Sequence, residues 1–238
     1  MKIQIPYQPR NVQAYIHQEL DKHRFSLLCL HRRCGKTTLC LNHLIKAAMT
    51  NKNHNPRYAY IAPTYKQAKS IAFDFLKFYT KKIPGTKYNE SELRCDLING
   101  ARISLLSSEN PDSIRGIYLN GAIIDETAQI NSELLSEVIT PALSDRKGFM
   151  ILVGTPKGMA NLFYDYYQKA QGDPNWFLHI AKASDTKIVD EDELAAALAV
   201  MGSQKYEQEF ECSFIGNIQG SIYGDVIASL EDKKQITR

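Results

Sequence analysis

The chain has 238 residues, 44% of them hydrophobic and 23% charged, which describes an ordinary globular domain able to bury a substantial core. A formal net charge of +3 neither requires nor excludes nucleic-acid binding, so any contact with DNA must be local. The five cysteines include no C-x-x-C pair, which argues against a zinc ribbon or disulfide scaffold. No apolar run approaches the roughly 18 residues of a membrane span, and no signal peptide is evident, so we expect a cytoplasmic chain without membrane contact.

Short apolar runs with strand character recur along the chain and are mostly separated by helical patterns. The runs are 25–30, 58–62, 101–106, 122–125, 149–154 and 177–183. This alternation predicts an α/β fold, in which a mostly parallel sheet is covered by helices on both faces.

Several helices are signalled by residues suited to capping. Thr64, with Gln67 three residues later, is placed to cap the helix that comes after the second run. Asp190 and Glu193 can form an acidic cap for a helix over 190–201, and another helix is expected over 203–212.

The chain changes character near residue 216, where glycines and then a charged end replace the regular patterns. We therefore expect one domain over 1–215, followed by a linker or tail over 216–238.

The stretch LCLHRRCGKT contains a candidate phosphate-binding loop. The first apolar run leads into Gly35-Lys36-Thr37, which begins an amphipathic helix. Backbone N–H groups at such a helix start bind phosphate, Lys36 would reach the β- and γ-phosphates, and Thr37 would ligate magnesium. The usual pattern has a glycine five residues before Gly35, where this chain has Leu30. A chance helix start is the alternative.

Adjacent carboxylates, Asp125 and Glu126, end the short apolar run in GAIIDE. In phosphoryl-transfer sites, a strand-end aspartate holds the Mg²⁺ shell, and a following glutamate polarises the attacking water. The distance along the chain from Lys36 leads us to expect the two strands to be neighbours in one sheet. Alternatively, the two acids only cap a helix over 130–138.

Two further positions are candidates for contact with a nucleotide. Thr155 comes after the run 149–154, so its hydroxyl is expected at the carboxyl end of the sheet, although a strand-end threonine often only starts a turn. Before the sheet, Gln8, Arg10 and Gln13 could each read an adenine edge or lie on a solvated helix. We choose Gln13.

Together these elements resemble the ATPase domain of the large terminase subunits of tailed phages, the DNA-packaging motors, over roughly residues 9–225. The resemblance is carried by HRRCGKT, IAPTYKQA, NPDSIRGIYLNGAIIDE, ITPALSDRKG, LVGTPKG and YEQEFECSF. A loop with arginines in place of glycines is typical of that family, which accounts for Leu30. The resemblance implies an additional-strand, RecA-like P-loop NTPase that hydrolyses ATP with Mg²⁺.

The resemblance also implies roles for individual residues. Lys36 and Thr37 match the phosphate and magnesium ligands, and Asp125 and Glu126 match the metal-binding and water-activating acids. Thr155 lies in the motif that couples hydrolysis to movement. The residues implied in nucleotide binding are Gln13, Arg32, Arg33, Cys34, Gly35, Lys36, Thr37 and Thr38.

An arginine finger is a further implication. Arg115 resembles a finger presented to a neighbouring subunit, whereas Arg32 or Arg33 could supply positive charge from within the loop. The alternatives are a surface ion pair for Arg115 and a bridge from either loop arginine to Glu126 or another acid.

The partners that the resemblance implies are double-stranded DNA, a portal protein, a small terminase subunit and other copies of the chain in a ring, expected to be a pentamer. The implied location is the cytoplasm of an infected bacterial host. Family members usually continue into a nuclease domain of ribonuclease H type, and we expect no nuclease activity in this chain. A superfamily-two-like helicase or translocase is one alternative, but it would need a second RecA-like domain. A non-hydrolysing, nucleotide-dependent assembly module is another, and Glu126 argues against it.

Overall fold

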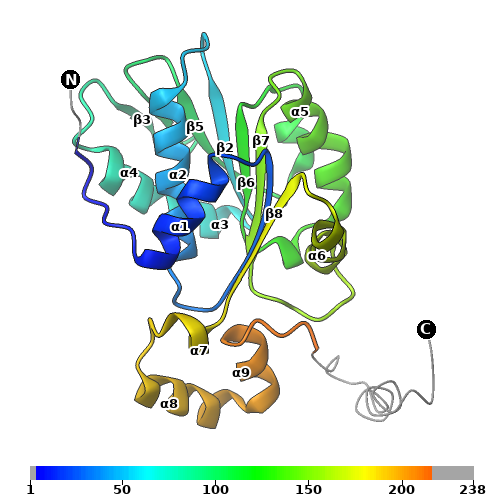
Figure 1. Cartoon of the computed structure of the whole chain (residues 1–238). Coiled ribbons are helices and arrows are strands. Elements are labelled where there is room, and N and C mark those ends of the chain that lie inside the picture. Colours follow the sequence, from blue (N-terminus) through cyan, green and yellow to red (C-terminus); the bar gives the residue numbers. More distant parts are fainter. Residues whose placement is uncertain (1–3, 216–238) are drawn as a thin grey trace.

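The computed structural model describes residues 4–215, apart from the side chains of Asp112 and Ser113. Within this part of the chain, the centre is an eight-stranded sheet with the order β3-β4-β5-β2-β6-β7-β1-β8 (Figure 1). The strands are β1 Phe25–Leu30, β2 Arg57–Ala62, β3 Lys87–Asn89, β4 Arg94–Asp96, β5 Arg102–Ser107, β6 Gly121–Ile124, β7 Phe149–Gly154 and β8 Trp176–Ala181. All neighbouring pairs from β5 to β8 are parallel, whereas β3 and β4 add an antiparallel edge.

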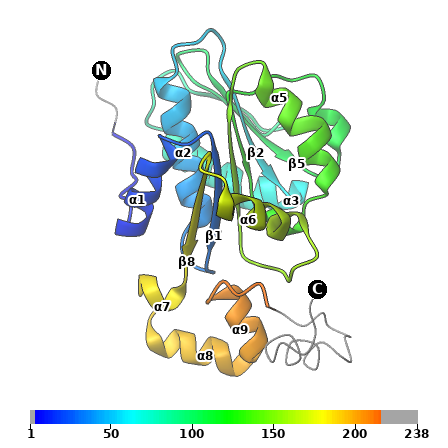
Figure 2. The ribbon, with the colours of Figure 1, turned by 45° about the vertical axis from the view of Figure 1, so that its right-hand side comes forward.

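Helices cover both faces of the sheet, as the sequence predicted (Figures 1 and 2). The first face carries α1 Asn11–Leu20, α2 Lys36–Thr50 and a continuous helical segment made of α3 Tyr65–Gln67, the π-helix η1 Ala68–Phe73 and α4 Asp74–Thr80. The second face carries the π-helix η4 Leu134–Ile139, α5 Thr140–Ser144 and α6 Leu162–Gly172. Short 3₁₀ turns, η2 Pro111–Ile114 and η3 Thr127–Gln129, lie on either side of β6 in the chain.

Strand β1 shows why the runs are continuously apolar. Leu28 and Leu30 contribute to the core on the α2 face, while Leu27 and Cys29 contribute to the core on the α6 face, and all four are fully buried. A strand buried on both faces is apolar at consecutive positions rather than at alternate ones, and in β1 only the small, fully buried Ser26 departs from this pattern.

The carboxyl ends of the parallel strands point towards a small helical group. Strand β8 leads into α7 Ala183–Thr186, and then come α8 Glu191–Met201 and α9 Ser203–Glu209. These three helices lie below the strand ends in both views (Figures 1 and 2).

All six predicted strands are present, two of them with the predicted bounds, and the mostly parallel sheet is confirmed. The predicted cap at Thr64 is confirmed, because its Oγ1 accepts a hydrogen bond from the backbone N–H of Gln67 at 3.2 Å. Asp190 does precede α8, but its side chain makes no capping hydrogen bond, so the predicted acidic cap is wrong. The last predicted helix is shorter than expected, and its final predicted residue, Cys212, has a φ of 57° instead.

Two further predictions concern the C-terminal tail and the membrane. The predicted tail over 216–238 falls outside the described residues. Within residues 4–215, no helix is both long and apolar enough to span a membrane.

Candidate nucleotide-binding site

The loop between β1 and α2 has the backbone of an anion-binding turn. Arg33 and Gly35 both have positive φ, 70° and 87°, and Gly35 is the residue that precedes the first turn of α2. The φ of Gly35 favours glycine, and a Cβ there would lie 2.8 Å from Nε2 of Gln13, so the Gln13 amide would have to shift. The loop therefore delivers the chain to a helix N-terminus, where backbone N–H groups favour phosphate.

Lys36 begins α2, and its side chain turns back over the loop. Its Nζ donates hydrogen bonds to the carbonyl oxygens of Leu30 at 3.3 Å and His31 at 3.5 Å. The ammonium group is thus held at the carboxyl end of β1, as a phosphate-binding lysine requires.

His31 is a buried loop residue whose contacts could not be foreseen from the sequence. Its side chain is fully buried, with Nδ1 2.6 Å from the carbonyl oxygen of Arg32 and Nε2 2.8 Å from the hydroxyl of Thr186 in α7. A carbonyl can only accept, so Nδ1 carries the proton and Nε2 accepts from the hydroxyl. Burial lowers the pKa of His31, which keeps the ring neutral in this arrangement.

A backbone contact joins the same loop to α9. The N–H of Arg32 donates to the carbonyl oxygen of Glu209 at 2.7 Å, and the N–H of Ala183 donates to that of Phe210 at 2.8 Å. The helical group after β8 is therefore attached directly to the candidate phosphate loop.

Gln13 lies behind the loop and is almost fully buried. Its Nε2 donates to the carbonyl oxygens of Cys34 at 3.3 Å and Gly35 at 3.4 Å, while its Oε1 accepts from the N–H of Arg10 at 3.0 Å. Arg10 also reaches the Cys34 carbonyl, at 3.4 Å. In this conformation the Gln13 amide supports the loop. Contact of Gln13 with an adenine stays a prediction, and it would require the hydrogen bonds to the Cys34 and Gly35 carbonyls to break.

The acidic end of β6 is joined to the loop helix through a buried tyrosine. The phenol of Tyr60, on β2, donates to the Asp125 carboxylate. The side chain of Thr37 lies near the same phenol and acts to lower its pKa. Thr37 and Asp125 are the two residues predicted to ligate magnesium. The structure brings them to one point of the sheet edge, with Tyr60 between them.

Asp125 is held where a negative charge is costly. Burial is the largest effect on this carboxyl and raises its pKa from the ordinary 3.8 to about 6, although the hydrogen bond from Tyr60 acts in the opposite direction. Burial likewise raises the pKa of Tyr60, so the phenol keeps its proton and remains a donor. A cation that binds beside Asp125 would therefore be favoured, because it would neutralise the carboxylate that burial destabilises.

Glu126 has a left-handed backbone, with φ 47° and ψ 45°, and its N–H donates to the Asp125 carboxylate at 2.9 Å. The next residue, Thr127, is fully buried, and its hydroxyl lies within hydrogen-bond distance of the carbonyl oxygens of Ile124 and Val153. The turn that carries Glu126 is therefore fixed to the ends of both β6 and β7. The side chain itself is only half-buried.

Strand β7 lies between the two motif-bearing strands, so the expectation that β1 and β6 are neighbours is wrong. Gly154 ends β7, and a Cβ at this position would lie 3.4 Å from the N atom of Thr127 and 3.5 Å from the Cα of Glu126. Thr155 comes next and is 2% exposed. The inserted strand thus brings the predicted Thr155 to the edge between the loop and the acids.

The three predicted arginines are exposed. Arg115 comes after η2 and forms a 3.2 Å ion pair with Glu137 of η4, with both side chains more than half exposed. Such exposed pairs contribute about 0–1 kcal/mol, so this contact does not fix the guanidinium strongly. Arg32 and Arg33 lie in the loop itself.

The remaining loop residues have structural partners. Cys34 is buried, and its N–H donates to the His31 carbonyl at 3.2 Å, while the Thr38 carbonyl accepts from the Asn42 side chain at 2.8 Å. Within the described residues, no group of three or more His, Cys, Asp or Glu side chains is arranged to hold a metal ion.

Comparison with known proteins identifies the family. A family model described as the terminase large subunit, T4likevirus-type, N-terminal, matches residues 28–224. The chain belongs to this family. The terminase large subunit of Thermus virus P23-45 is 29% identical over 180 residues, covering 68% of this chain and 36% of that protein. This terminase-family chain thus spans about a third of the curated relative.

Solved structures show the same fold. The large terminase ATPase domain of Thermus phage P74-26 has a TM-score of 0.76 and 23% identity, covering 89% of this chain and 96% of that one. The large terminase of a thermophilic bacteriophage, solved in complex with ATP-gamma-S, has a TM-score of 0.69 and 14% identity, covering 86% and 52%. The predicted P-loop, RecA-like fold is confirmed.

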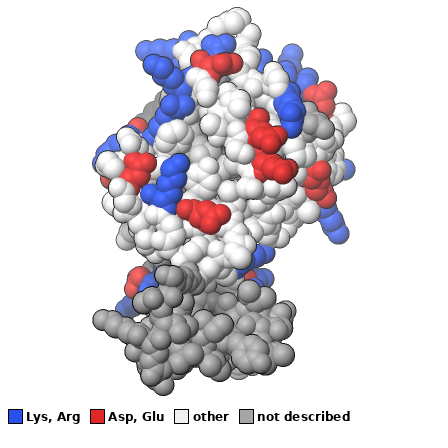
Figure 3. Space-filling view, turned by 90° about the vertical axis from the view of Figure 1, so that its right-hand side faces the viewer, with Lys and Arg blue, Asp and Glu red and all other residues white. Residues whose placement is uncertain are grey.

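The surface on the α5 and α6 side of this terminase-family chain carries both signs of charge (Figure 3). Lysine and arginine side chains alternate there with aspartate and glutamate, and over the described part of this face neither sign forms a continuous track.

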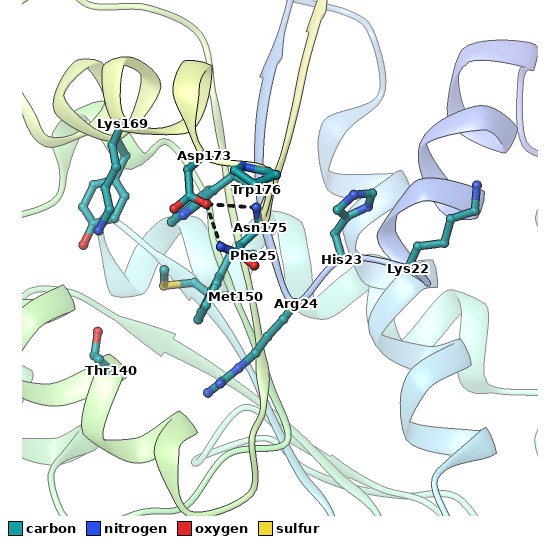
Figure 4. Close-up of a pocket in the computed structure, with 12 residues that line it drawn as sticks. Lys22, His23, Arg24, Phe25, Thr140, Met150, Lys169, Asp173, Asn175 and Trp176 are labelled. Atoms are coloured by element: carbon teal, nitrogen blue, oxygen red, sulfur yellow. Dashed lines mark hydrogen bonds between the residues drawn. The ribbon is translucent and has the colours of Figure 1, made fainter.

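An open cavity of about 730 Å³ lies at the opposite end of the sheet from the phosphate loop (Figure 4). It is lined by residues at the amino ends of three strands, including Phe25 of β1, Met150 of β7 and Trp176 of β8. Ligands of open α/β sheets bind at the carboxyl ends of the strands. This cavity therefore lies away from the candidate nucleotide-binding site.

Proposed function

We propose that this chain is the ATP-hydrolysing motor domain of a viral large terminase, and that it powers the movement of double-stranded DNA into a procapsid. The observation that carries the proposal is the hydrogen bond from Tyr60 to Asp125 beside Thr37, whose side chain lowers the pKa of the same phenol, so that the phosphate-loop helix and the acidic strand end meet at one point. Two findings support ATP as the bound nucleotide: the family membership of the chain, and the ATP-gamma-S complex of the thermophilic phage enzyme.

In this proposal the loop binds the triphosphate. Lys36 moves from the Leu30 and His31 carbonyls to the β- and γ-phosphates, and backbone N–H groups at the start of α2 bind the remaining charge. The exposed guanidinium groups of Arg32 and Arg33 add positive charge at the mouth of the loop.

Magnesium fits the donor set at this edge, because the Thr37 hydroxyl and the Asp125 carboxylate are hard oxygen ligands of the kind Mg²⁺ prefers. When bound, Mg²⁺ neutralises the negative charge on the phosphates. Glu126, on its fixed turn, accepts the proton of the attacking water, and Thr155 beside it couples the state of the site to β7.

Arg115 is proposed to act in trans. It sits on an exposed segment, and the neighbouring Gly116 has a φ of 79°, a conformation that favours glycine. Its ion pair with Glu137 is exposed and of a kind that contributes about 0–1 kcal/mol, which is small beside the effect of an arginine finger on a γ-phosphate. An arginine finger is worth about 10³–10⁵ in rate.

A mixing experiment tests the trans role. Arg115→Ala and Glu126→Gln subunits, each inactive alone, should recover hydrolysis when combined, since some interfaces then pair an intact Arg115 with an intact Glu126. If mixed assemblies form and stay inactive, Arg115 does not act across the interface, and Arg32 or Arg33 becomes the finger.

The assembly also belongs to the proposal. Residues 1–215 form the motor domain, and residues 216–238 connect it to the rest of a longer subunit. Several copies, expected to be five, form a ring that works with a portal protein and a small terminase subunit in the cytoplasm of an infected bacterium.

Binding of a fluorescent ATP analogue tests the site. Lys36→Ala should abolish measurable binding, whereas Lys46→Ala, on the same helix α2 but paired with Asp21 on the surface, should bind like the wild type. Unchanged affinity in Lys36→Ala would remove the phosphate-loop assignment.

A further inference from the structure

Tyr60 places a hydroxyl group in a part of β2 that is otherwise packed as core. The residue is 1% exposed and belongs, with Tyr58 and Ala62, to the core on the α2 face of the sheet. A phenylalanine would fill the same space without burying a hydroxyl, which costs free energy unless the hydroxyl has a partner. Packing therefore does not account for this hydroxyl, and the partner that it has is the carboxylate of Asp125.

The pairing of β2 with β6 brings the phenol to that carboxylate. Tyr60 is opposite Ile123, and the N–H of Asp125 donates to the carbonyl oxygen of Ile61 at 2.9 Å. Side chains alternate between the two faces of a strand, so Asp125 follows Ile123 on the α2 face. Tyr60 thus starts two residues short of Asp125 along the sheet, and its long side chain spans the difference.

Both oxygens of the Asp125 carboxylate are held. Oδ1 accepts from the N–H of Glu126 at 2.9 Å, and Oδ2 accepts from the phenol of Tyr60. The backbone donor alone would leave the carboxylate free to turn, because the torsion that rotates an aspartate carboxylate has broad minima. The phenol therefore fixes the carboxylate plane and keeps Oδ2 at a point near which the side chain of Thr37 also lies.

We propose that Tyr60 is a positioning residue for the metal, because it holds the Asp125 carboxylate in the orientation in which Asp125 and Thr37 serve the same Mg²⁺. The inference rests on the proposed nucleotide site and adds to it a residue that touches neither the metal nor the nucleotide. Carboxylates that serve a metal are themselves hydrogen-bonded, and loss of such a partner typically costs about 10–100-fold in metal affinity.

Competition with the metal is the alternative role for the same contact. If the phenol blocked Oδ2, removal of its hydroxyl would raise the metal affinity instead of lowering it. The geometry favours positioning, because each oxygen of an ionised carboxylate has more than one acceptor site. Oδ2 can therefore accept from Tyr60 and still serve the metal or one of its waters.

Tyr60→Phe tests the proposal, because it removes the hydroxyl and keeps the ring. The affinity of the chain for a non-hydrolysable fluorescent ATP analogue, measured with Mg²⁺ and again with EDTA, gives the gain in affinity that the metal supplies. This gain should fall about tenfold in the variant, whereas the affinity in EDTA should match the wild type, since Lys36 and the loop are untouched. An unchanged or larger gain would overturn the inference, and an equal loss of affinity in EDTA would show a general structural role and refute it.

Tyr58→Phe is the matched control, because Tyr58 lies two residues earlier on the same strand and the same face. Its hydroxyl donates to the Ala47 carbonyl at 3.1 Å and accepts from the Asn51 side chain at 2.8 Å, so it is engaged away from the acids. The Mg²⁺-dependent gain should be the same in this variant as in the wild type. A loss as large as that of Tyr60→Phe would mean that any buried hydroxyl of β2 has this effect, which would refute a specific role for Tyr60.

A double-substitution cycle tests whether Tyr60 acts through Asp125. In the Asp125→Asn background, Tyr60→Phe should cause little further loss of the Mg²⁺-dependent gain, because the carboxylate that the phenol positions is already absent. A full tenfold loss in that background would refute the inference. A wild-type chain that binds the analogue equally well with Mg²⁺ and with EDTA would overturn the proposed metal site itself, so failure of that site is distinguishable from failure of the role of Tyr60.

Discussion

The two ends of the central sheet are built in opposite ways, although the same strands form both. At the amino ends of β1 and β8, Phe25 stacks on Trp176 with ring centres 5.5 Å apart, and Tyr166 packs on the same indole at 5.4 Å. The Arg24 guanidinium lies 4.9 Å from the Phe25 ring centre and donates to the Gly148 carbonyl at 3.0 Å. Aromatic rings and cations there stabilise one another.

At the carboxyl ends, the side chains and backbone are arranged less favourably for stability. Arg33 and Glu126 are non-glycine residues with positive φ, and the partly buried Asp125 carries a raised pKa. Such features cost free energy and persist where the surrounding structure over-determines them. The difference teaches that stabilising contacts at the amino ends of the strands offset the free-energy cost of a strained and charged site at the carboxyl ends.

The largest effect that this comparison predicts is catalytic. Glu126→Gln should leave affinity for the ATP analogue within about threefold of the wild type and reduce phosphate release by about 10²–10⁴-fold, because only the proton-accepting group is lost. Single-turnover hydrolysis measures this. A variant that keeps most of the wild-type rate would show that another group accepts the proton.

The next effect concerns stability at the opposite end. Trp176→Ala should reduce the free energy of unfolding by about 3–5 kcal/mol, since it removes a large buried side chain and the contacts of two other rings. Urea unfolding followed by circular dichroism measures the loss. At urea concentrations where the variant remains folded, its affinity for the ATP analogue should match the wild type. A selective loss of affinity would mean that the two ends are not independent.

Asp125→Asn should instead stabilise the nucleotide-free chain at pH 7, by up to about 3 kcal/mol, because the neutral amide can still accept from Tyr60. The folded pKa of about 6 exceeds the ordinary 3.8, so the folded state binds more protons between these values. The wild type therefore loses stability relative to the variant as pH rises from about 4 through about 6, and the difference disappears near pH 4.

Urea unfolding at several pH values checks this dependence. Asp173→Asn, at the cavity end, is the matched control, because the backbone N–H and side-chain amide of Asn175 lower the pKa of Asp173. That substitution should not stabilise the chain at pH 7. A stability gain for Asp125→Asn that is independent of pH would contradict the cost assigned to the charge.

The fold could largely be predicted because its central strands, such as β2, β6 and β7, are buried along most of their length and therefore appear as nearly continuous apolar runs. Strands β3 and β4 could not be predicted from the sequence, because each has only three residues and pairs at the antiparallel edge of the sheet. The same limit explains the error about β1 and β6. Chain order gives no information on which strands are neighbours, and β7 lies between them.

The candidate site divides in the same way. Lys36, Thr37, Asp125 and Glu126 belong to local patterns of strand ends and helix starts, so the sequence indicates them, and their roles remain predictions. Tyr60 looks like one more apolar strand residue, and its link to Thr37 and Asp125 exists only once β2 and β6 are paired.

The smallest predicted effect concerns the contact of His31 with Thr186. This contact is also the least visible in the sequence, because the two residues are 155 positions apart. Thr186→Val keeps the shape of the side chain but removes the hydroxyl that donates to Nε2, so it should lower the free energy of unfolding by about 0.5–1.5 kcal/mol. The released loop should also bind the ATP analogue a few-fold more weakly. Thr50→Val is the control, since its hydroxyl bonds the Lys46 carbonyl at an exposed helix end, away from the loop. If both variants bind equally well, His31 fixes the fold of α7 without positioning the phosphate loop, and the carboxyl end of the sheet depends on its own backbone alone.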